Sequence, residues 1–283
     1  MIDETAEEIA DMQTHSSSVV AVKAARALRE LTQREFPSVD EYCRTLERNS
    51  SALRRANPSH ASLHNTQREI VAAVEDAAPA SVEAAQAVTE EAIEAVVQRV
   101  ETGKQAAAEE LATLIADEGT LLTHDYSTTV LSGITAAVRD GATFTVYVTE
   151  ARPRFLGRKM ARRLAAIEAV DARLLVDGAS GHYLPECDRV VVGMDCIVED
   201  TLYNRIGTYP LAATAADVGV PVTAVGSAAK LVEGGFAFEN EFRSPSEVMR
   251  EPAEGFTIEN PAYDATPTRL LDSVVTDEGL TEW

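Results

Sequence analysis

Polar side chains that could do chemistry follow several short apolar runs of this sequence. Asp195 ends the run Val190–Met194, which has the β-branched content of a buried parallel strand. In open α/β sheets, ligands bind just beyond the carboxyl ends of such strands. The other candidates share this placement or follow soon after a strand, and they are Glu150, Arg152, Asn204, Arg205 and Lys230. An acid, an amide and several bases at successive strand ends predict a pocket for a polar, phosphorylated small molecule.

Each of these residues also has a structural interpretation. Asp125 or Ser127 could cap the helix expected after His124, and its free N–H groups could instead hold a phosphate or carboxylate. Glu150 and Arg152 could form a structural ion pair. Cys196 is disfavoured as a nucleophile, because neighbouring residues of a strand point to opposite faces and Asp195 already faces the pocket.

The sequence indicates neither a metal nor a cofactor. His60 and His64 have helical spacing, but no third ligand accompanies them. No Gly-x-Gly triplet occurs, so a dinucleotide fingerprint is missing, and there is no Walker loop.

The elements that must position these residues alternate in type after Gly119. Apolar runs predict strands, and the segments between them predict helices, which together indicate a parallel, doubly wound sheet. The expected strands are 120–123, 143–148, 173–176, 189–192 and 221–225, and the expected helices are 127–139, 154–170 and 210–218.

The first part of the chain is expected to be helical. Apolar residues recur at helical spacing from Val82 to Ile115, and Ser38 with Glu41 forms a capping box. We therefore expect an α/β protein with a helical N-terminal domain, residues 1–115, and a Rossmann-like, mostly parallel doubly wound C-terminal domain, residues 116–283.

Composition limits the class of protein. The net charge is -21, which opposes binding to nucleic acid or to anionic membranes. The acidic residues behind this charge are spread along the whole chain, which favours adaptation to a halophile's cytoplasm. The alternative is an acidic surface that binds a basic partner. We expect a cytoplasmic protein, because a signal peptide and a long apolar run are both missing from the sequence. Three unclustered cysteines argue against a disulfide framework.

Several segments together resemble the translation initiation factor 2B alpha/beta/delta family, which includes ribose-1,5-bisphosphate isomerases and methylthioribose-1-phosphate isomerases. The matching segments are 121–127, 148–153 with Gly157, 193–195, 204–209, Lys230 and 259–267. The resemblance implies a helical domain, a Rossmann-like domain and a homo-oligomer. It also implies that the isomerases use a cysteine and an aspartate, and Asp195 matches the aspartate.

The chain departs from the isomerases at several of these positions. Asp125 stands where they have the cysteine, and a carboxylate is no soft nucleophile. Their two N-terminal phosphate segments are replaced by residues 14–18 and 57–59, and Arg205 replaces a lysine.

We therefore expect a regulatory protein without turnover, binding partners such as initiation factor 2 subunits and a phosphorylated metabolite. The alternative is a ribose-1,5-bisphosphate isomerase, with Asp195 and Asp125 as its proton-transfer groups. A second alternative is a non-catalytic oligomeric scaffold.

Overall fold

The structure is a computed structural model that describes residues 2–10, 17–58, 60–232, 236–251 and 254–282. The chain divides into two compact units, residues 1–103 with 229–238 and residues 104–228 with 239–283. The division falls within helix α6 (Val82–Leu114), so the last turns of this helix, from Lys104 on, belong to the second unit, whereas the sequence analysis expected the boundary after residue 115.

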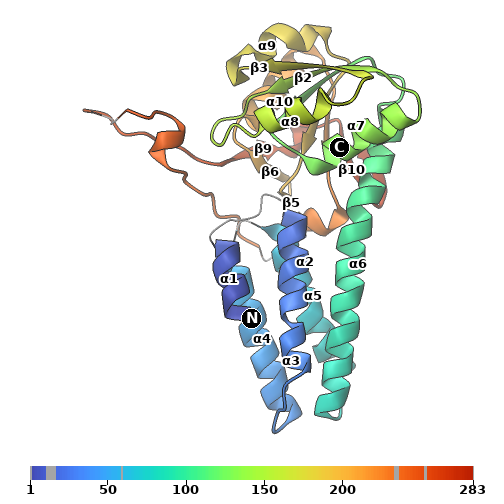
Figure 1. Cartoon of the computed structure of the whole chain (residues 1–283), viewed down its shortest axis with the longest axis vertical. Coiled ribbons are helices and arrows are strands. Elements are labelled where there is room, and N and C mark those ends of the chain that lie inside the picture. Colours follow the sequence, from blue (N-terminus) through green and yellow to red (C-terminus); the bar gives the residue numbers. More distant parts are fainter. Residues whose placement is uncertain (1, 11–16, 59, 233–235, 252–253, 283) are drawn as a thin grey trace. The chain divides into compact units, whose positions relative to one another are not determined.

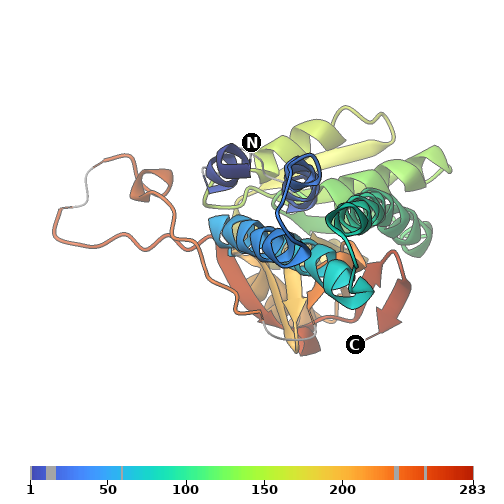
Figure 2. The same cartoon turned by 90° about the horizontal axis from the view of Figure 1, so that it is seen from below.

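The first unit is a bundle of helices that lie side by side (Figures 1 and 2). Leucines, valines and isoleucines at helical spacing form its core, including Leu28, Leu46 and Ile70, which are fully buried. Ser38 accepts a hydrogen bond from the N–H of Glu41 and so begins one of these helices as expected. The elements are α1 (Ile2–Ala10), α2 (Ser17–Ala27), α3 (Arg29–Thr32), α4 (Val39–Ala56), α5 (Ala61–Ala77), the larger part of α6, and the short strand β8 (Leu231–Val232).

The second unit is built on a seven-stranded sheet in the order β11-β10-β7-β4-β1-β2-β3. All neighbouring strands are parallel except β11, which runs antiparallel to β10. The strands are β1 (Thr120–His124), β2 (Phe144–Thr149), β3 (Val170–Leu175), β4 (Arg189–Gly193), β7 (Val222–Val225), β10 (Ser273–Thr276) and β11 (Gly279–Glu282).

Helices cover both faces of this sheet. Val146 and Val148 of β2 are buried in the cluster that holds α7 (Thr128–Arg139), α8 (Gly157–Leu164) and the end of α6. The residue between them, Tyr147, points the other way and contacts Tyr183 of α9 (Ser180–Tyr183), at 4.8 Å between ring centroids. Helix α10 (Thr208–Val218) contacts α9 on that second face. The predicted fold class, a helical N-terminal part followed by a Rossmann-like, mostly parallel doubly wound sheet, is confirmed.

A small antiparallel sheet, which the sequence analysis did not foresee, lies next to the candidate residues. It contains β5 (Cys196–Val198), β6 (Thr201–Arg205) and β9 (Tyr263–Pro267). Asn204 and Arg205 therefore belong to a strand. The two-residue turn at Glu199 and Asp200, between two apolar runs, is the signal that could have revealed this hairpin.

Helix α8 is shorter than the 154–170 segment expected from the sequence. Ala151, Arg154 and Phe155 have positive φ angles of 57°, 75° and 55°, so the chain turns sharply before the helix begins. The strand β3 then begins at Val170. None of the described helices is long and apolar enough to cross a membrane.

Candidate functional site

The strands that end at the candidate residues are neighbours in the sheet. β1 lies between β4 and β2 in the sheet. Helix α7, which connects β1 to β2, and helix α9, which precedes β4, cover opposite faces of the sheet, so this position is a topological switch point. Asp125 directly follows β1, Asp195 follows β4, and Glu150 follows β2. Residues from three strand ends therefore meet at the edge where open α/β sheets bind ligands.

Arg205 joins the two aspartates. Its Nε atom lies 3.3 Å from Oδ2 of Asp125 and 3.8 Å from Oδ2 of Asp195. The Asp125 side chain is only 6% exposed, and those of Arg205 and Asp195 are 14% exposed. Two carboxylates thus share one guanidinium in a largely dry environment.

Two atoms of this group are buried without a hydrogen-bond partner among the described residues. They are Oδ1 of Asp125 and Nη1 of Arg205. Buried polar atoms are nearly always satisfied, so an open acceptor and an open donor on the two residues of one ion pair indicate a place for a polar ligand. Asp125 also has a φ angle of 60°, a strained conformation that is concentrated at functional sites.

Burial raises the pKa of Asp125, and the neighbouring charge of Asp195 raises it further, although Arg205 and His124 oppose the shift. The pKa of Arg205 is lowered by burial but raised more by Asp195, Tyr263 and Asp125, so it stays charged. Asp125 is therefore disposed to hold a proton in this site.

Local structure fixes where Arg205 lies. Its guanidinium stacks over the Tyr263 ring at 4.7 Å, across the β6–β9 pair. The turn after it is held by Asp264, whose Oδ2 accepts hydrogen bonds from the N–H groups of Gly207 and Tyr209 at 2.7 and 3.0 Å. The start of α10 is thereby tied to β9.

His124 supports the same turn from β1. Its Nε2 donates to the carbonyl of Ile206 at 2.8 Å, and its Nδ1 lies 2.6 Å from Oγ1 of Thr149. Gly207 has a φ angle of 106°, and a Cβ atom there would lie 2.6 Å from Cε1 of His124. Only glycine fits this position.

Glu150 binds two arginines. Its Oε1 lies 3.5 Å from Nε of Arg152 and its Oε2 accepts from Arg158 at 2.7 Å. Asp177 accepts the backbone N–H groups of Ala151 and Arg152. The sequence left open whether Glu150 and Arg152 form an ion pair, and they do, with the Arg152 side chain 52% exposed.

Arg154 is a residue that the sequence analysis missed. Together with Asp125, Arg152 and Arg205 it lines a small pocket of about 10 Å³, roughly the space of one water molecule. Burial and the like charges of Arg205 and Arg243 lower the pKa of Arg154. This positive surplus favours an anion. The only signal in the sequence was the Arg-Pro-Arg spacing.

Two predicted residues are placed differently. Asn204 is buried and donates to Oγ1 of Thr208 at 3.0 Å, which makes it part of the turn. Lys230 belongs to the first unit, so its grouping with these residues stays a prediction. Residues 14–16 and Ser59, from the replaced phosphate segments, lie outside the described residues.

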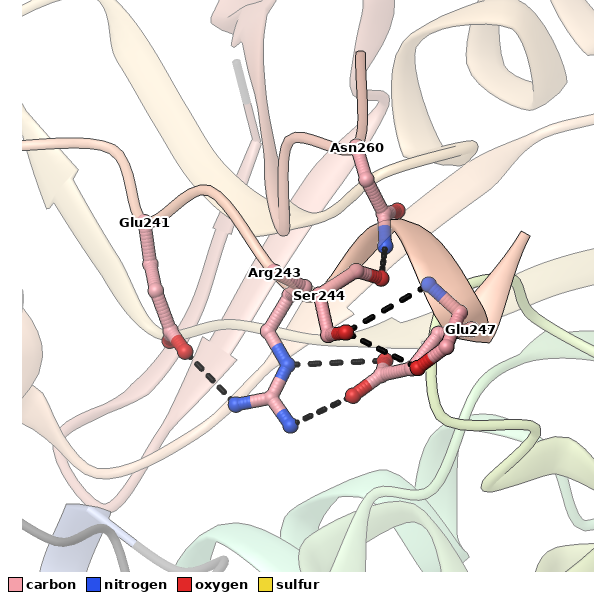
Figure 3. A network of polar contacts seen from close by, with 6 residues as sticks. Glu241, Arg243, Ser244, Glu247 and Asn260 are labelled. Carbon is pink, nitrogen blue, oxygen red and sulfur yellow. Dashed lines mark hydrogen bonds and ion pairs between the residues drawn. The ribbon is translucent and has the colours of Figure 1, made fainter. Parts of the chain in front are cut away.

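A polar network holds the segment that leads into β9. Figure 3 shows Arg243 between Glu241 and Glu247, to which it donates at 2.6 and 2.7 Å. Asn260 donates to the carbonyl of Ser244 at 2.9 Å. Glu241 and Arg243 thus add charge near Arg205 and Arg154. No group of three or more His, Cys, Asp or Glu side chains suited to a metal ion occurs within the described ranges.

The chain is similar to a known protein family over nearly its whole length. The model of the initiation factor 2 subunit family matches residues 13–282. The chain belongs to this family. Among solved structures, the Pyrococcus horikoshii OT3 translation initiation factor eIF-2B superposes with a TM-score of 0.82 at 23% identity, covering 99% of this chain and 96% of that one. That likeness shows the shared fold.

Curated relatives in the family carry an enzyme's name. A ribose 1,5-bisphosphate isomerase from Haloterrigena turkmenica is 32% identical, over 97% of this chain and 88% of its own length. The protein of the same name from Methanocaldococcus jannaschii is 30% identical, over 99% and 91%.

These relatives correct the functional expectation from the sequence. Six archaeal proteins that are 28–32% identical to the chain are named ribose 1,5-bisphosphate isomerase, so the regulatory interpretation without turnover is wrong. The expectation against an enzyme is wrong with it. The missing thiol does not by itself exclude turnover. Replacement of the isomerases' cysteine by Asp125 removes a nucleophile but leaves a group that can transfer protons.

Proposed function

We propose that this protein is an aldose–ketose isomerase that converts ribose 1,5-bisphosphate to ribulose 1,5-bisphosphate. The observation that carries the proposal is the pair of carboxyl groups, Asp125 and Asp195, held on Arg205 at adjacent strand ends. The names of the archaeal relatives support ribose 1,5-bisphosphate as the proposed substrate.

The chemistry of this substrate requires an acid and a base. Its C1 oxygen carries a phosphate, so isomerisation must move hydrogen from C2 to C1 and break the bond between C1 and the ring oxygen. A base removes the C2 proton, a C1–C2 double bond forms, and the ring oxygen leaves with a proton from an acid. The enol phosphate then takes a proton at C1 from the protonated base, while its C2 hydroxyl returns a proton to the acid. Both groups end as they began.

The surroundings of the two aspartates assign these roles. Asp125 is the acid, because burial favours its protonated form. Asp195 is the base, being the more exposed carboxylate of the pair. Arg205 is the positioning group between them and stabilises negative charge on the enol oxygen.

Arg152 and Arg154 are proposed to bind phosphate. Guanidinium groups form paired hydrogen bonds with phosphate oxygens, and Arg154 lies among like charges that an anion would neutralise. Glu150 orients Arg152, and Asn204 holds the turn after Arg205. Because the pocket holds roughly one water molecule, the half-exposed Arg152 side chain must move when the substrate enters.

Turnover of the purified protein tests this proposal. Incubation with ribose 1,5-bisphosphate should yield ribulose 1,5-bisphosphate, and Asp195→Asn should abolish the product. Asp200→Asn is the matched control, since Asp200 is an exposed acid on the turn of the same hairpin. Absence of product with the folded wild-type protein would refute the proposal.

We further propose a cytoplasmic homo-oligomer adapted to high salt. The net charge of -21 supports the salt adaptation, because self-repulsion of this size needs screening. Sedimentation in concentrated KCl tests the oligomer, and a monomer at micromolar concentration would contradict it.

A further inference from the structure

One outer edge of the seven-stranded sheet takes no part in the proposed reaction. β3 is the last strand on this side, and β2 is its only partner among the described strands. The ladder with β2 uses the odd-numbered residues of this segment, since the carbonyls of Ala169 and Leu175 accept hydrogen bonds from N–H groups at the start of β2 and directly after it. In a parallel ladder, the main-chain groups of the residues in between point away from the neighbouring strand. Ala172 and Leu174 therefore present main-chain donors and acceptors at the edge.

The side chains of this edge are accessible on both faces of the sheet. Asp171 and Arg173 lie on one face, where Nη2 of Arg173 donates to Oδ2 of Asp171 at 2.7 Å, and their side chains are 58% and 50% exposed. Leu174 lies on the other face and is 47% exposed, and Val176, just after the strand, is 60% exposed. Large exposed hydrophobic side chains beside open main-chain groups make this edge a template for another strand.

The charges of β3 indicate which strand fits this edge. Charged residues on an edge strand often prevent association, and Asp171 and Arg173 could do so here. However, they have opposite signs and flank a single residue, Ala172. If a second copy of β3 lies antiparallel with a two-fold axis at Ala172, Asp171 of each copy lies opposite Arg173 of the other. Opposite charges directly across two strands stabilise the pair, so the edge is complementary to itself.

The neighbouring registers are disfavoured by the same charges. An axis at Asp171 or at Arg173 would place that residue opposite its own copy, and an axis at Leu174 would place Asp171 opposite Asp177. Like charges directly opposite each other destabilise a strand pair. The axis at Ala172 avoids these contacts. It also places the open main-chain groups of Ala172 opposite those of its copy, as a hydrogen-bonded pair of an antiparallel ladder requires.

We propose that β3 pairs with β3 of a second copy of this chain, antiparallel and with the two-fold axis at Ala172, so that the sheets of two copies join. Leu174 of each copy then lies opposite Val170 of the other and covers it. This contact is one interface of the homo-oligomer proposed above, and it does not depend on the isomerase reaction.

Disulfide cross-linking of the full-length protein tests the register. Ala172→Cys should form a covalent dimer on oxidation, because the Cα atoms of a hydrogen-bonded antiparallel pair lie about 5.5 Å apart, within the range of disulfides. Leu174→Cys is the matched control, since an axis at Ala172 separates its two copies by about 14 Å, at about 3.4 Å per residue. The wild type sets the background from its own cysteines, Cys43, Cys187 and Cys196.

Charge substitutions test the same contact in solution. Asp171→Arg places like charges across the interface and should lower the mass of the particle in sedimentation at least twofold. Adding Arg173→Asp to this variant makes the edge complementary again and should restore the mass. Asp217→Arg changes an exposed acid of α10 and should leave the mass unchanged. The KCl concentration is the lowest at which the wild type stays folded, because salt screens these charges.

The proposal is overturned if Ala172→Cys cross-links no more than the wild type, if Leu174→Cys cross-links as readily, or if Asp171→Arg keeps the wild-type mass. Any of these results with an oligomeric wild type would leave the proposed homo-oligomer in place and contradict only this interface. A monomeric wild type would contradict both.

Discussion

The Nε atom of Arg205 lies 3.3 Å from Oδ2 of Asp125, where a strand of the small antiparallel sheet meets the end of a strand in the large parallel sheet. Asp195 completes the group at 3.8 Å. One positive charge therefore serves two carboxyl groups, and a proton on either of them relieves the excess negative charge. We propose that this arrangement supplies the acid and the base of the reaction without a thiol.

The protonation of Asp125 predicts a pH-dependent effect on stability. A carboxyl group with a raised pKa in the folded state stabilises fully below its unfolded pKa, and this contribution is lost as pH rises through the folded value. Wild type should therefore lose stability relative to Asp125→Asn as pH rises from about 4. Urea unfolding at several pH values measures the difference, with Asp200→Asn as the exposed control. Wild type gaining on the variant with rising pH would show that Arg205 outweighs burial.

Arg154 should matter for substrate binding. Arg154→Gln removes a charged donor to phosphate and should raise KM about tenfold or more, because hydrogen bonds to charged groups contribute roughly 1.5–3 kcal/mol. The change in kcat should be smaller, since Arg154 transfers no proton. Arg163→Gln, which removes an exposed arginine of α8, is the matched control for charge. An unchanged KM in Arg154→Gln would remove this residue from the phosphate site.

Gly207 should be more sensitive to substitution than Gly219 at the other end of α10. Both have positive φ angles, 106° and 79°, but a Cβ atom at Gly219 would meet nothing within 4 Å, whereas one at Gly207 would meet His124. Gly219→Ala should cost about 1 kcal/mol of backbone strain, and Gly207→Ala about 2–4 kcal/mol in all. Equal free energies of unfolding for the two variants would contradict this packing.

The acidic surface predicts stabilisation by salt. The Debye length falls from about 10 Å at 0.1 M to about 3 Å at 1 M, so KCl should screen the repulsion that a net charge of -21 creates. The melting temperature should rise by about 10 °C or more across this range, and sucrose at equal osmolality should raise it less. Full stability in dilute buffer would argue against adaptation to salt.

Sequence patterns predicted the sheet because buried parallel strands have short runs of β-branched residues, such as Val190–Val192. They also placed Asp195 at a strand end. They did not predict the contact of Asp195 with Arg205, because that contact depends on the hairpin of β5 and β6 and on the pairing of β6 with residues of β9 that lie 58 to 66 positions further along. The contribution of Arg154 depends on a sharp turn with positive φ angles, which non-glycine residues rarely signal.

Turnover of ribose 1,5-bisphosphate by Asp125→Asn tests whether Asp125 shares proton transfer with Asp195. Asparagine keeps the size of the side chain but cannot donate a carboxyl proton. With Asp200→Asn active and all variants folded, kcat of Asp125→Asn should fall about 10²–10⁴-fold, as expected for loss of a general acid. Wild-type kcat in Asp125→Asn would show that Asp125 is not the general acid.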